Sequence, residues 1–496
     1  MAEQQGVERQ GSAAATDVAY TVDAERRLPL PDAARADMAW ECAGEHIDYT
    51  ATAGYIDVRT DTGALMGKMF SLSYVAKRPQ GAAARPVTFC YNGGPGSASV
   101  PINVGGIGPR RVVTDGLNHL PATPRTEDNP VTLLRQSDLV FLDALGTGYS
   151  VVAEDADAQD MWSVDGDADT FARAIAAWLT DNGRWGDPVY LFGESYGTVR
   201  NAVLMRVLAE RFVPVAGVIM LSSVFDWVQK MPGSDLGFMG LFPTYAATAR
   251  HFGKAGQGTD EATWFDEAMD FSERTYGPAL LRGDRLTPEE KASMAAEMSQ
   301  RIGLSADFIE RCNLRIDLDT FRRTLLADEG LVTGRFDTRF TTHAPSTSLG
   351  GTTPIMSDAS SDAVEPAWNA AFRRHLQDIG FAGAPIYPLS NFPKIGITWD
   401  RSHAAPDSGM RAAAPNVAYD IAAALKHNPT MRVLVIGGRY DAATPYWNVV
   451  RDLSCLFLPA ELKQRVELKL YSCGHMAYVD ETALEALGRD LAAFVR

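Results

Sequence analysis

The sequence predicts an α/β protein with a mostly parallel central sheet, helices on both faces and a helical insertion that caps it. Between residues 87 and 221, apolar runs typical of buried strands alternate with segments whose apolar residues recur every three or four positions. The same alternation returns from residue 432 to the end of the chain. Strands and helices that alternate in this way form parallel sheets, because each crossover helix packs back onto the sheet.

The expected elements follow in chain order. Short stretches within residues 47–75 alternate between apolar and polar residues and are rich in aromatic residues. They predict antiparallel strands at one edge of the sheet. Buried strands are expected at residues 87–91, 139–142, 188–192, 215–221, 432–436 and 466–471. Helices are expected at residues 168–179, 198–211 and 481–495, and within the insertion at 261–273, 288–302 and 316–327.

These patterns divide the chain into three regions. Residues 1–36 lack a periodic apolar pattern, and we expect a disordered or loosely docked N-terminal arm there. Residues 37–224 and 429–496 form the sheet core, and residues 225–428 form the helical cap. Within the cap, the stretch 343–361 is rich in Gly, Ser, Thr and Pro, which predicts a long flexible loop.

Composition excludes several classes of function. The formal net charge of -16 argues against a nucleic-acid partner, because such binding relies on Lys and Arg that neutralise phosphates. No apolar run approaches the roughly 20 residues that span a bilayer, so we expect no membrane partner. The first residues show no secretory signal, which predicts a cytoplasmic protein, or a secreted or periplasmic one if a signal was removed.

The cysteines predict neither disulfides nor a metal site. They are few, odd in number and widely spaced, without a Cys-x-x-Cys pair. Their positions are Cys42, Cys90, Cys312, Cys455 and Cys473. We therefore expect free thiols, no metal and no cofactor.

The segment Gly193-Glu-Ser195-Tyr-Gly197 predicts a nucleophile elbow. It follows a predicted strand and precedes a predicted helix, which is the context in which a serine is exposed on a sharp turn. Small residues two positions before and after the serine avoid collisions with neighbouring backbone. The chain is therefore predicted to have the α/β-hydrolase fold, with Ser195 as its nucleophile.

A glycine-rich turn about a hundred residues earlier predicts an oxyanion hole. Asn92-Gly-Gly-Pro-Gly96 follows the strand at residues 87–91, and glycines there let backbone N–H groups approach a negative charge. On this geometry the donors are the N–H groups of Gly94 and of Tyr196, the residue after the nucleophile.

The other two members of a catalytic triad are predicted by chain order. In this fold the acid and the histidine follow the serine, each after a later strand. Asp441 follows the strand at residues 432–436, and His475 follows the strand at residues 466–471. We expect His475 to take and return the proton of Ser195, and Asp441 to orient the imidazole.

Four blocks of the sequence resemble the serine carboxypeptidases, peptidase family S10. They are Asn92-Gly-Gly-Pro-Gly96, Asp143-Ala-Leu-Gly-Thr-Gly-Tyr-Ser150, Gly193-Glu-Ser-Tyr-Gly197 and Gly474-His-Met476, in the family's order. The resemblance implies removal of the C-terminal residue of a peptide without a metal. Free cysteines fit a cytoplasmic, bacterial-type member of that family.

The resemblance also implies a site for the substrate's free carboxylate. It is formed by Asn92, Gly93 and Glu194, and Glu194 must be protonated to donate a hydrogen bond. Family members carry a second glutamate close by, whereas this chain has Gly106 at the corresponding place. One cause of a raised Glu194 pKa is thereby lost, so we expect a weakened acidic pH preference.

Arginines offer an alternative charge for the carboxylate. Arg200 lies one turn past the elbow, and Arg110 and Arg111 follow the segment that contains Gly106. Two other functions stay open: an esterase or acyltransferase that uses the same triad, and an inactive binding protein on a hydrolase scaffold. The preferred interpretation is a serine-type carboxypeptidase that hydrolyses the C-terminal peptide bond of peptides with a free C-terminus; the oligomeric state is left open.

Overall fold

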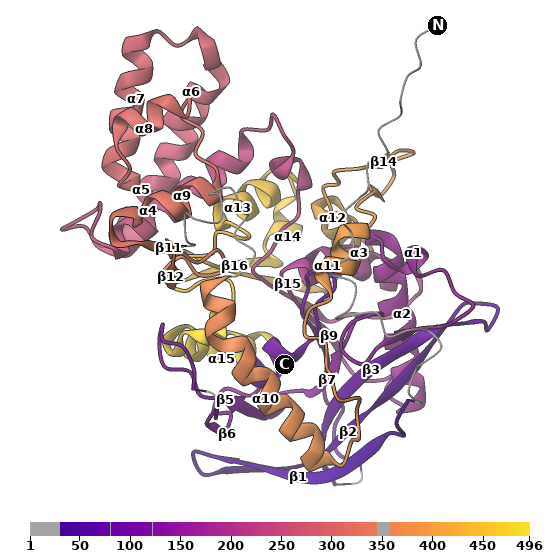
Figure 1. Cartoon of the computed structure of the whole chain (residues 1–496). Helices are drawn as coiled ribbons and strands as arrows, with labels where there is room; N and C mark the ends of the chain where they lie inside the picture. The colour runs from indigo at the N-terminus through magenta and orange to yellow at the C-terminus, as the bar shows by residue number, and fades with distance from the viewer. Residues whose placement is uncertain (1–29, 80, 122, 345–357) are drawn as a thin grey trace, which may run out of the picture.

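A twisted central sheet organises the molecule (Figure 1). The computed structural model describes residues 30–79, 81–121, 123–344 and 358–496. In that part of the chain the sheet has ten strands in the order β1-β2-β3-β7-β4-β9-β10-β15-β16, with β8 paired to β3. In this order, the six strands β7, β4, β9, β10, β15 and β16 are parallel to one another. The strands β1, β2 and β3 add an antiparallel edge. The predicted α/β class with a mostly parallel sheet is confirmed.

The elements have the following bounds. The strands are β1 (Ala34–Cys42), β2 (Glu45–Arg59), β3 (Leu65–Ala76), β4 (Val87–Tyr91), β5 (Arg110–Val112), β6 (Thr126–Asp128), β7 (Asp138–Leu142), β8 (Val151–Val152), β9 (Val189–Glu194), β10 (Gly217–Leu221), β11 (Leu331–Thr333), β12 (Thr341–His343), β13 (His403–Ala404), β14 (Arg411–Ala412), β15 (Arg432–Gly438) and β16 (Val466–Tyr471). The α-helices are α1 (Ala158–Met161), α2 (Val164–Asp181), α3 (Tyr196–Glu210), α4 (Leu236–His251), α5 (Glu261–Phe271), α6 (Gly277–Arg282), α7 (Pro288–Ile302), α8 (Ala306–Arg311), α9 (Leu318–Thr324), α10 (Ala359–Ile379), α11 (Phe392–Thr398), α12 (Ala418–His427), α13 (Tyr446–Ser454), α14 (Ala460–Lys463) and α15 (Glu481–Phe494).

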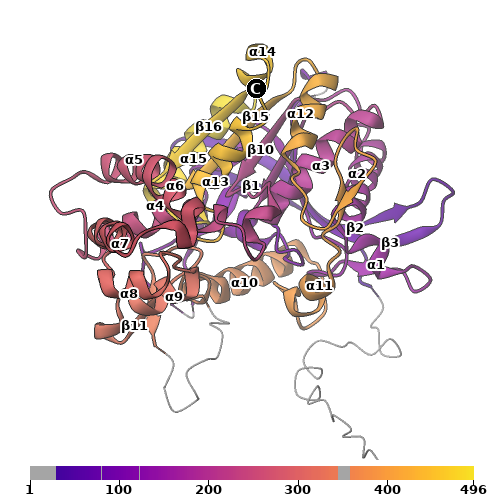
Figure 2. The same cartoon turned by 90° about the horizontal axis from the view of Figure 1, so that it is seen from above.

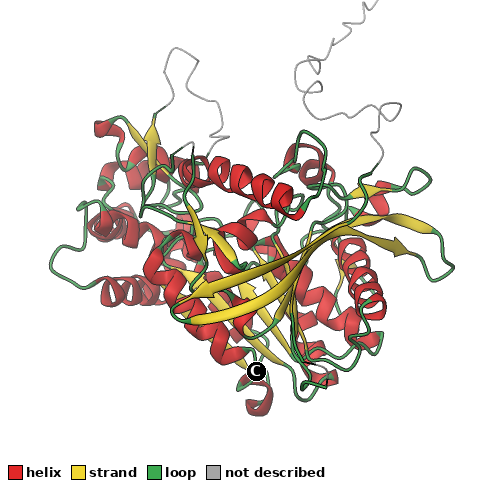
Figure 3. Ribbon diagram, turned by 90° about the horizontal axis from the view of Figure 1, so that it is seen from below, coloured by secondary structure: helices red, strands yellow, loops and turns green. Residues whose placement is uncertain are grey.

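Helices cover both faces of the sheet and bury its strands. On one face α2, α3 and α12 pack their apolar residues against β4, β9, β10 and β15. On the other face α15 and α10 pack against the same sheet and against β1, β2 and β3. The strands β4, β7, β9 and β10 are fully buried, which explains why their sequences are continuous apolar runs. Figure 3 shows the strong twist of the strands beneath these helices.

The antiparallel edge differs from the expectation for residues 47–75. Two of the expected stretches form one long strand, β2, and a further strand, β1, pairs with it along its whole length. β1 starts at Ala34, inside the expected N-terminal arm, while residues 1–29 lie outside the described residues. Its sequence is rich in alanine, which has a low strand propensity, so the alternation was hard to recognise. Most of the loop expected at residues 343–361 also lies outside the described residues.

The proposed cap, residues 225–428, contains two kinds of segment. Helices α4 to α9 pack around an apolar cluster of their own, and Figures 1 and 2 both place them together at one side of the sheet. Helices α10 and α12 instead pack directly on the sheet. Helix α7 shows the local signals that fix such an element: a Thr287–Glu290 capping box, Pro288 in the first turn and Gly303 in the left-handed conformation after the last turn.

Candidate active site

Ser195 lies on a strained turn between β9 and α3. Its φ of 60° and ψ of -126° are unusual for a residue with a side chain, and they lift the serine out of the strand. The Ser195 N–H donates to the carbonyl of Leu221 at 2.9 Å, and the Thr198 hydroxyl donates to the Ser195 carbonyl at 2.7 Å. A Cβ on Gly193 would lie 2.2 Å from the Gly197 oxygen, so the turn needs glycine there. The segment has the geometry of the predicted elbow.

His475 and Asp441 form a buried pair at the carboxyl ends of β16 and β15. The distance between His475 Nδ1 and Asp441 Oδ2 is 2.7 Å, and Asp441 is completely buried. Asp441 also accepts hydrogen bonds from the N–H groups of Ala443 and Thr444 and from the Thr444 hydroxyl, at 2.8, 3.0 and 2.5 Å. A carboxylate at Nδ1 favours the tautomer with its proton there, which leaves the lone pair of Nε2 free to accept a proton.

His475 is held in place by two residues that the sequence did not indicate. The His475 N–H donates to the carbonyl of Phe336 at 2.6 Å, and the Phe336 ring lies 4.9 Å from the imidazole centre. On the other side, the Ser222 hydroxyl donates to the His475 carbonyl at 2.6 Å. Phe336 comes from the insertion, more than a hundred residues away in sequence, and no local signal could have identified it.

The end of β10 connects the nucleophile turn to the histidine. The carbonyl of Leu221 accepts from Ser195, and its neighbour Ser222 donates to His475. When His475 is protonated, its charge is close enough to lower the pKa of Glu194, the residue before Ser195. Ser195, Asp441 and His475 therefore lie at neighbouring strand ends of one sheet edge.

The Asn92–Gly96 turn lies directly against the elbow. A Cβ on Gly93 would come within 2.3 Å of the Tyr196 nitrogen, so the two backbones touch at a point where only glycine fits. Gly94 has a φ of +104°, which L-residues with side chains rarely adopt. Within the described residues, neither the Gly94 nor the Tyr196 N–H has a hydrogen-bond acceptor. Both amides are thus free to bind a negatively charged oxygen.

Glu194 is a buried acid next to Ser195. Burial raises the pKa of its carboxyl to about 7, although the charge of His475 and hydrogen bonds from Tyr478 and Asn92 lower it. The Asn92 side chain is oriented by its Oδ1, which accepts from the Ile102 N–H at 3.0 Å. At pH 6 the carboxyl is mostly protonated and has a proton to donate.

Tyr478 lies against Gly106, the position that corresponds to the second glutamate of the family that the sequence resembles. A Cβ on Gly106 would meet the Tyr478 ring at 3.2 Å, and the Tyr478 hydroxyl donates to Glu194 Oε2 at 2.8 Å. Gly106 belongs to the buried π-helical turn η2 (Pro101–Ile107), which no periodic apolar pattern predicted. A phenol is therefore the neighbour of Glu194 at this point, and the Glu194 pKa is kept high by burial and, to a smaller extent, by the charge of Asp441.

Arg200 is a buried structural residue. Its guanidinium makes two hydrogen bonds to Asp167, at 2.7 and 3.3 Å, and one to the carbonyl of Asn92, at 2.9 Å. It also lies over the Phe171 ring at 4.1 Å. All its donors face protein groups in a fully buried setting, so Arg200 holds the Asn92 turn and is not positioned to bind a substrate carboxylate.

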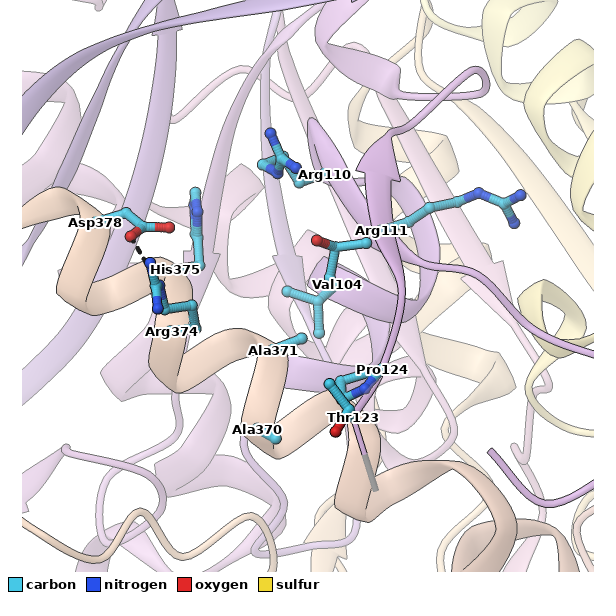
Figure 4. A pocket seen from close by; sticks show the side chains of 11 residues that line it. Val104, Arg110, Arg111, Thr123, Pro124, Ala370, Ala371, Arg374, His375 and Asp378 are labelled. Atoms are coloured by element: carbon cyan, nitrogen blue, oxygen red, sulfur yellow. Dashed lines mark hydrogen bonds and ion pairs between the residues drawn. The ribbon is translucent and has the colours of Figure 1, made fainter. Parts of the chain in front are cut away.

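Arg110 and Arg111 belong to a different part of the surface. They lie on β5, and Figure 4 shows them beside a pocket of about 350 Å³ that α10 also lines. Arg111 is paired with Glu127 and Glu481, at 2.8 and 2.9 Å, and Arg110 lies 3.4 Å from Asp128. None of the described residues that line this pocket belongs to the predicted site.

Cys473 is close to His475 in sequence but is an inert thiol. It is buried, and burial raises its pKa well above the ordinary value, which disfavours the nucleophilic thiolate. The described residues contain no group of three or more His, Cys, Asp or Glu side chains that could hold a metal ion. In the same part of the chain, no helix is both long and apolar enough to cross a membrane.

Comparisons with known proteins support the family resemblance. The sequence model of the serine carboxypeptidase family matches residues 43–211, which include the Asn92 turn and the Ser195 elbow. No curated protein gives a significant match.

Solved structures are similar over most of the chain. Kex1, a prohormone-processing carboxypeptidase from Saccharomyces cerevisiae, matches with a TM-score of 0.54 and 12% identity, over 90% of this chain and 91% of that one. A proline iminopeptidase from Mycobacterium smegmatis matches with a TM-score of 0.36 and 12% identity, over 89% of this chain and 98% of its own. The chain has the α/β-hydrolase fold, and its residues 43–211 are similar to the serine carboxypeptidase family.

Proposed function

We propose that this protein removes the C-terminal residue of peptides through an acyl-enzyme on Ser195. His475 Nε2 takes the serine proton as Oγ attacks the carbonyl of the last peptide bond, and the N–H groups of Gly94 and Tyr196 stabilise the oxyanion. His475 then protonates the leaving amine. Water, activated by the same imidazole, releases the acyl group and regenerates the serine.

The substrate's free carboxylate is bound, on this proposal, by Asn92, Gly93 and protonated Glu194. The observation that carries the proposal is the buried Glu194, whose carboxyl pKa of about 7 leaves it able to donate directly beside the nucleophile. A neutral acid next to Asn92 suits a carboxylate ligand, because it adds a donor without a like charge.

Dependence on the free carboxylate tests the proposal directly. An N-blocked dipeptide and its C-terminal amide share every other group, and we expect kcat/KM to be at least about 100-fold higher for the free acid. Hydrolysis can be followed by release of the C-terminal amino acid or its amide. Equal rates on the two substrates would exclude a carboxypeptidase.

The second candidate is an esterase or acyltransferase with the same triad. Gly106 favours it, because one acidic group of the expected carboxylate site is absent. Rapid turnover of a simple acyl ester, together with equal rates on the acid and amide peptides, is the result that would select this function.

A pH dependence of KM is expected from Glu194. Because its pKa is raised to about 7, the carboxyl is a donor below that pH and becomes a repelling carboxylate above it. KM for a free-acid peptide is therefore expected to rise about tenfold per pH unit above pH 7. Glu194→Gln keeps a donor at every pH, so its KM should stay flat between pH 6 and 8.5.

Steady-state kinetics with the wild type and Glu194→Gln separate this effect from others. The peptide amide serves as the control substrate, since it carries no charge for Glu194 to repel. A wild-type KM that is constant through pH 8.5, or a kcat/KM that peaks sharply below pH 5, would contradict the assignment.

A further inference from the structure

A second pocket, of about 300 Å³, opens beside the candidate triad. Its walls come from the ends of β10 and β15 and from the insertion, and they include Ser223, Lys230, Arg335 and Thr444. We call it the basic pocket. None of the described residues that line it is acidic, whereas the chain as a whole carries a net charge of -16.

The basic pocket touches the catalytic machinery on two sides. Thr444 donates its hydroxyl to Asp441 at 2.5 Å and lies 3.2 Å from His475 Nδ1. On the opposite wall, Ser223 follows Ser222, which hydrogen bonds to the His475 carbonyl. A group in the pocket therefore lies next to the reacting centre.

Two cations in the basic pocket lack a carboxylate partner. In the described part of the chain, neither Lys230 nor Arg335 forms an ion pair, although most arginines near the core do. A third cation, Arg401, lies 5.6 Å from the Trp227 ring, which Lys230 approaches to 5.1 Å.

An unsatisfied hydroxyl gives a second indication that the pocket takes a polar ligand. Ser223 is 2% exposed, and its Oγ has no hydrogen-bond partner among the residues that the structure describes. A buried hydroxyl without a partner is costly, and a ligand oxygen in the pocket would satisfy it. Uncompensated cations beside a free hydroxyl suit a carboxylate in particular.

The order of the strands decides which part of a peptide reaches the pocket. Asn92 follows β4, Ser195 follows β9, and the pocket residues Ser223 and Thr444 follow β10 and β15. The four strands are adjacent and parallel, so the Asn92 turn and the basic pocket flank Ser195 from opposite sides. With the terminal carboxylate at Asn92, the pocket receives the residue on the acyl side of the scissile bond.

We propose that the basic pocket binds the side-chain carboxylate of a glutamate or aspartate at the penultimate position of the substrate. This assignment rests on the proposed carboxypeptidase function for the direction in which the peptide binds. The binding of a carboxylate in the pocket does not depend on that function. Lys230 and Arg335 pair with the carboxylate, and the Ser223 hydroxyl donates to it.

Matched peptides test this specificity. N-blocked dipeptides with the same C-terminal residue and Glu, Gln or Lys at the penultimate position differ mainly in charge. The expected kcat/KM is about 10- to 100-fold higher for Glu than for Gln, and lowest for Lys. The Ser195→Ala protein should bind the Glu peptide more tightly by a similar factor, in a titration that needs no turnover.

A charge-matched control separates the pocket from the protein's overall field. Lys230→Gln/Arg335→Gln should bring the Glu-to-Gln ratio close to one and leave the Gln peptide within about threefold of wild type. Lys426→Gln/Lys463→Gln removes two exposed positive charges that do not line the pocket. This control should keep the wild-type ratio.

Each result bears on one of the two proposals. Equal binding of the Glu and Gln peptides to Ser195→Ala overturns the basic pocket as a specificity site, even if both peptides are hydrolysed. The Lys230→Gln/Arg335→Gln variant could instead lose the same factor in kcat/KM on the free-acid Glu and Gln peptides and lose nothing on their C-terminal amides. In that case the cations bind the terminal carboxylate, and the side-chain assignment is wrong. If no free-acid peptide is cleaved but the binding ratio persists, the pocket assignment stands and the carboxypeptidase proposal fails.

Discussion

Ser195→Ala is expected to lower kcat for peptide hydrolysis by about a million-fold while KM changes little. The hydroxyl supplies the only nucleophile of the proposed acyl-enzyme, and losses of this order follow the removal of a triad serine elsewhere. The φ of 60° is no easier for alanine than for serine, so the variant should keep the wild-type melting temperature within about 2 °C. Single-turnover hydrolysis and a thermal melt measure the two quantities.

Labelling by a serine-directed fluorophosphonate gives an independent readout of the same residue. The wild type should be labelled once, and Ser195→Ala should not be labelled at all. If the folded wild type also fails to react, Ser195 is not activated, and an inactive binding protein on a hydrolase scaffold becomes the better description.

Asp441→Asn is expected to reduce kcat by about 10,000-fold. An asparagine amide facing Nδ1 favours the histidine tautomer with its proton on Nε2, which can no longer accept the proton of Ser195. Thr444→Val offers a matched comparison, because it removes one hydrogen bond to the carboxylate and preserves the charge. We expect a loss of about tenfold for that variant.

The pH dependence of kcat distinguishes these two effects. Asp441→Asn should recover partly at high pH, where hydroxide can take the Ser195 proton in place of His475 Nε2, whereas Thr444→Val should keep the wild-type profile. Activity of Asp441→Asn above a tenth of wild type would show that another group orients His475.

The sequence predicted the buried strands and the residues at their ends for one physical reason. Strands such as β4 and β9 are covered on both faces, so nearly every residue is apolar, and the chemistry-bearing residues stand out where the run stops. Parallel strands then bring those ends to the same edge of the sheet. Ser195, Asp441 and His475 could therefore be proposed together, without any knowledge of the contacts between them.

The supporting contacts could not be predicted in this way. Tyr478 and Phe336 reach the site through packing between segments far apart in the chain, and neither carries a motif. Thr444, three residues after Asp441, had a local signal, since a hydroxyl at that spacing often bonds back to an aspartate. The edge strand β1 was missed although its residues alternate between apolar and polar, because its inward-facing positions begin with two alanines, which have a low strand propensity.

The contact between Phe336 and His475 limits how freely the insertion could be exchanged. Helices α4 to α9 pack around an apolar cluster of their own, whereas the carbonyl and the ring that contact His475 come from Phe336, which lies outside these helices. A chimera that replaces residues 334–340 along with these helices removes the carbonyl and the ring that fix the imidazole. Grafting a new cap for a new specificity should therefore join the two sequences before residue 334, so that the short segment leading to β12 stays with its native scaffold.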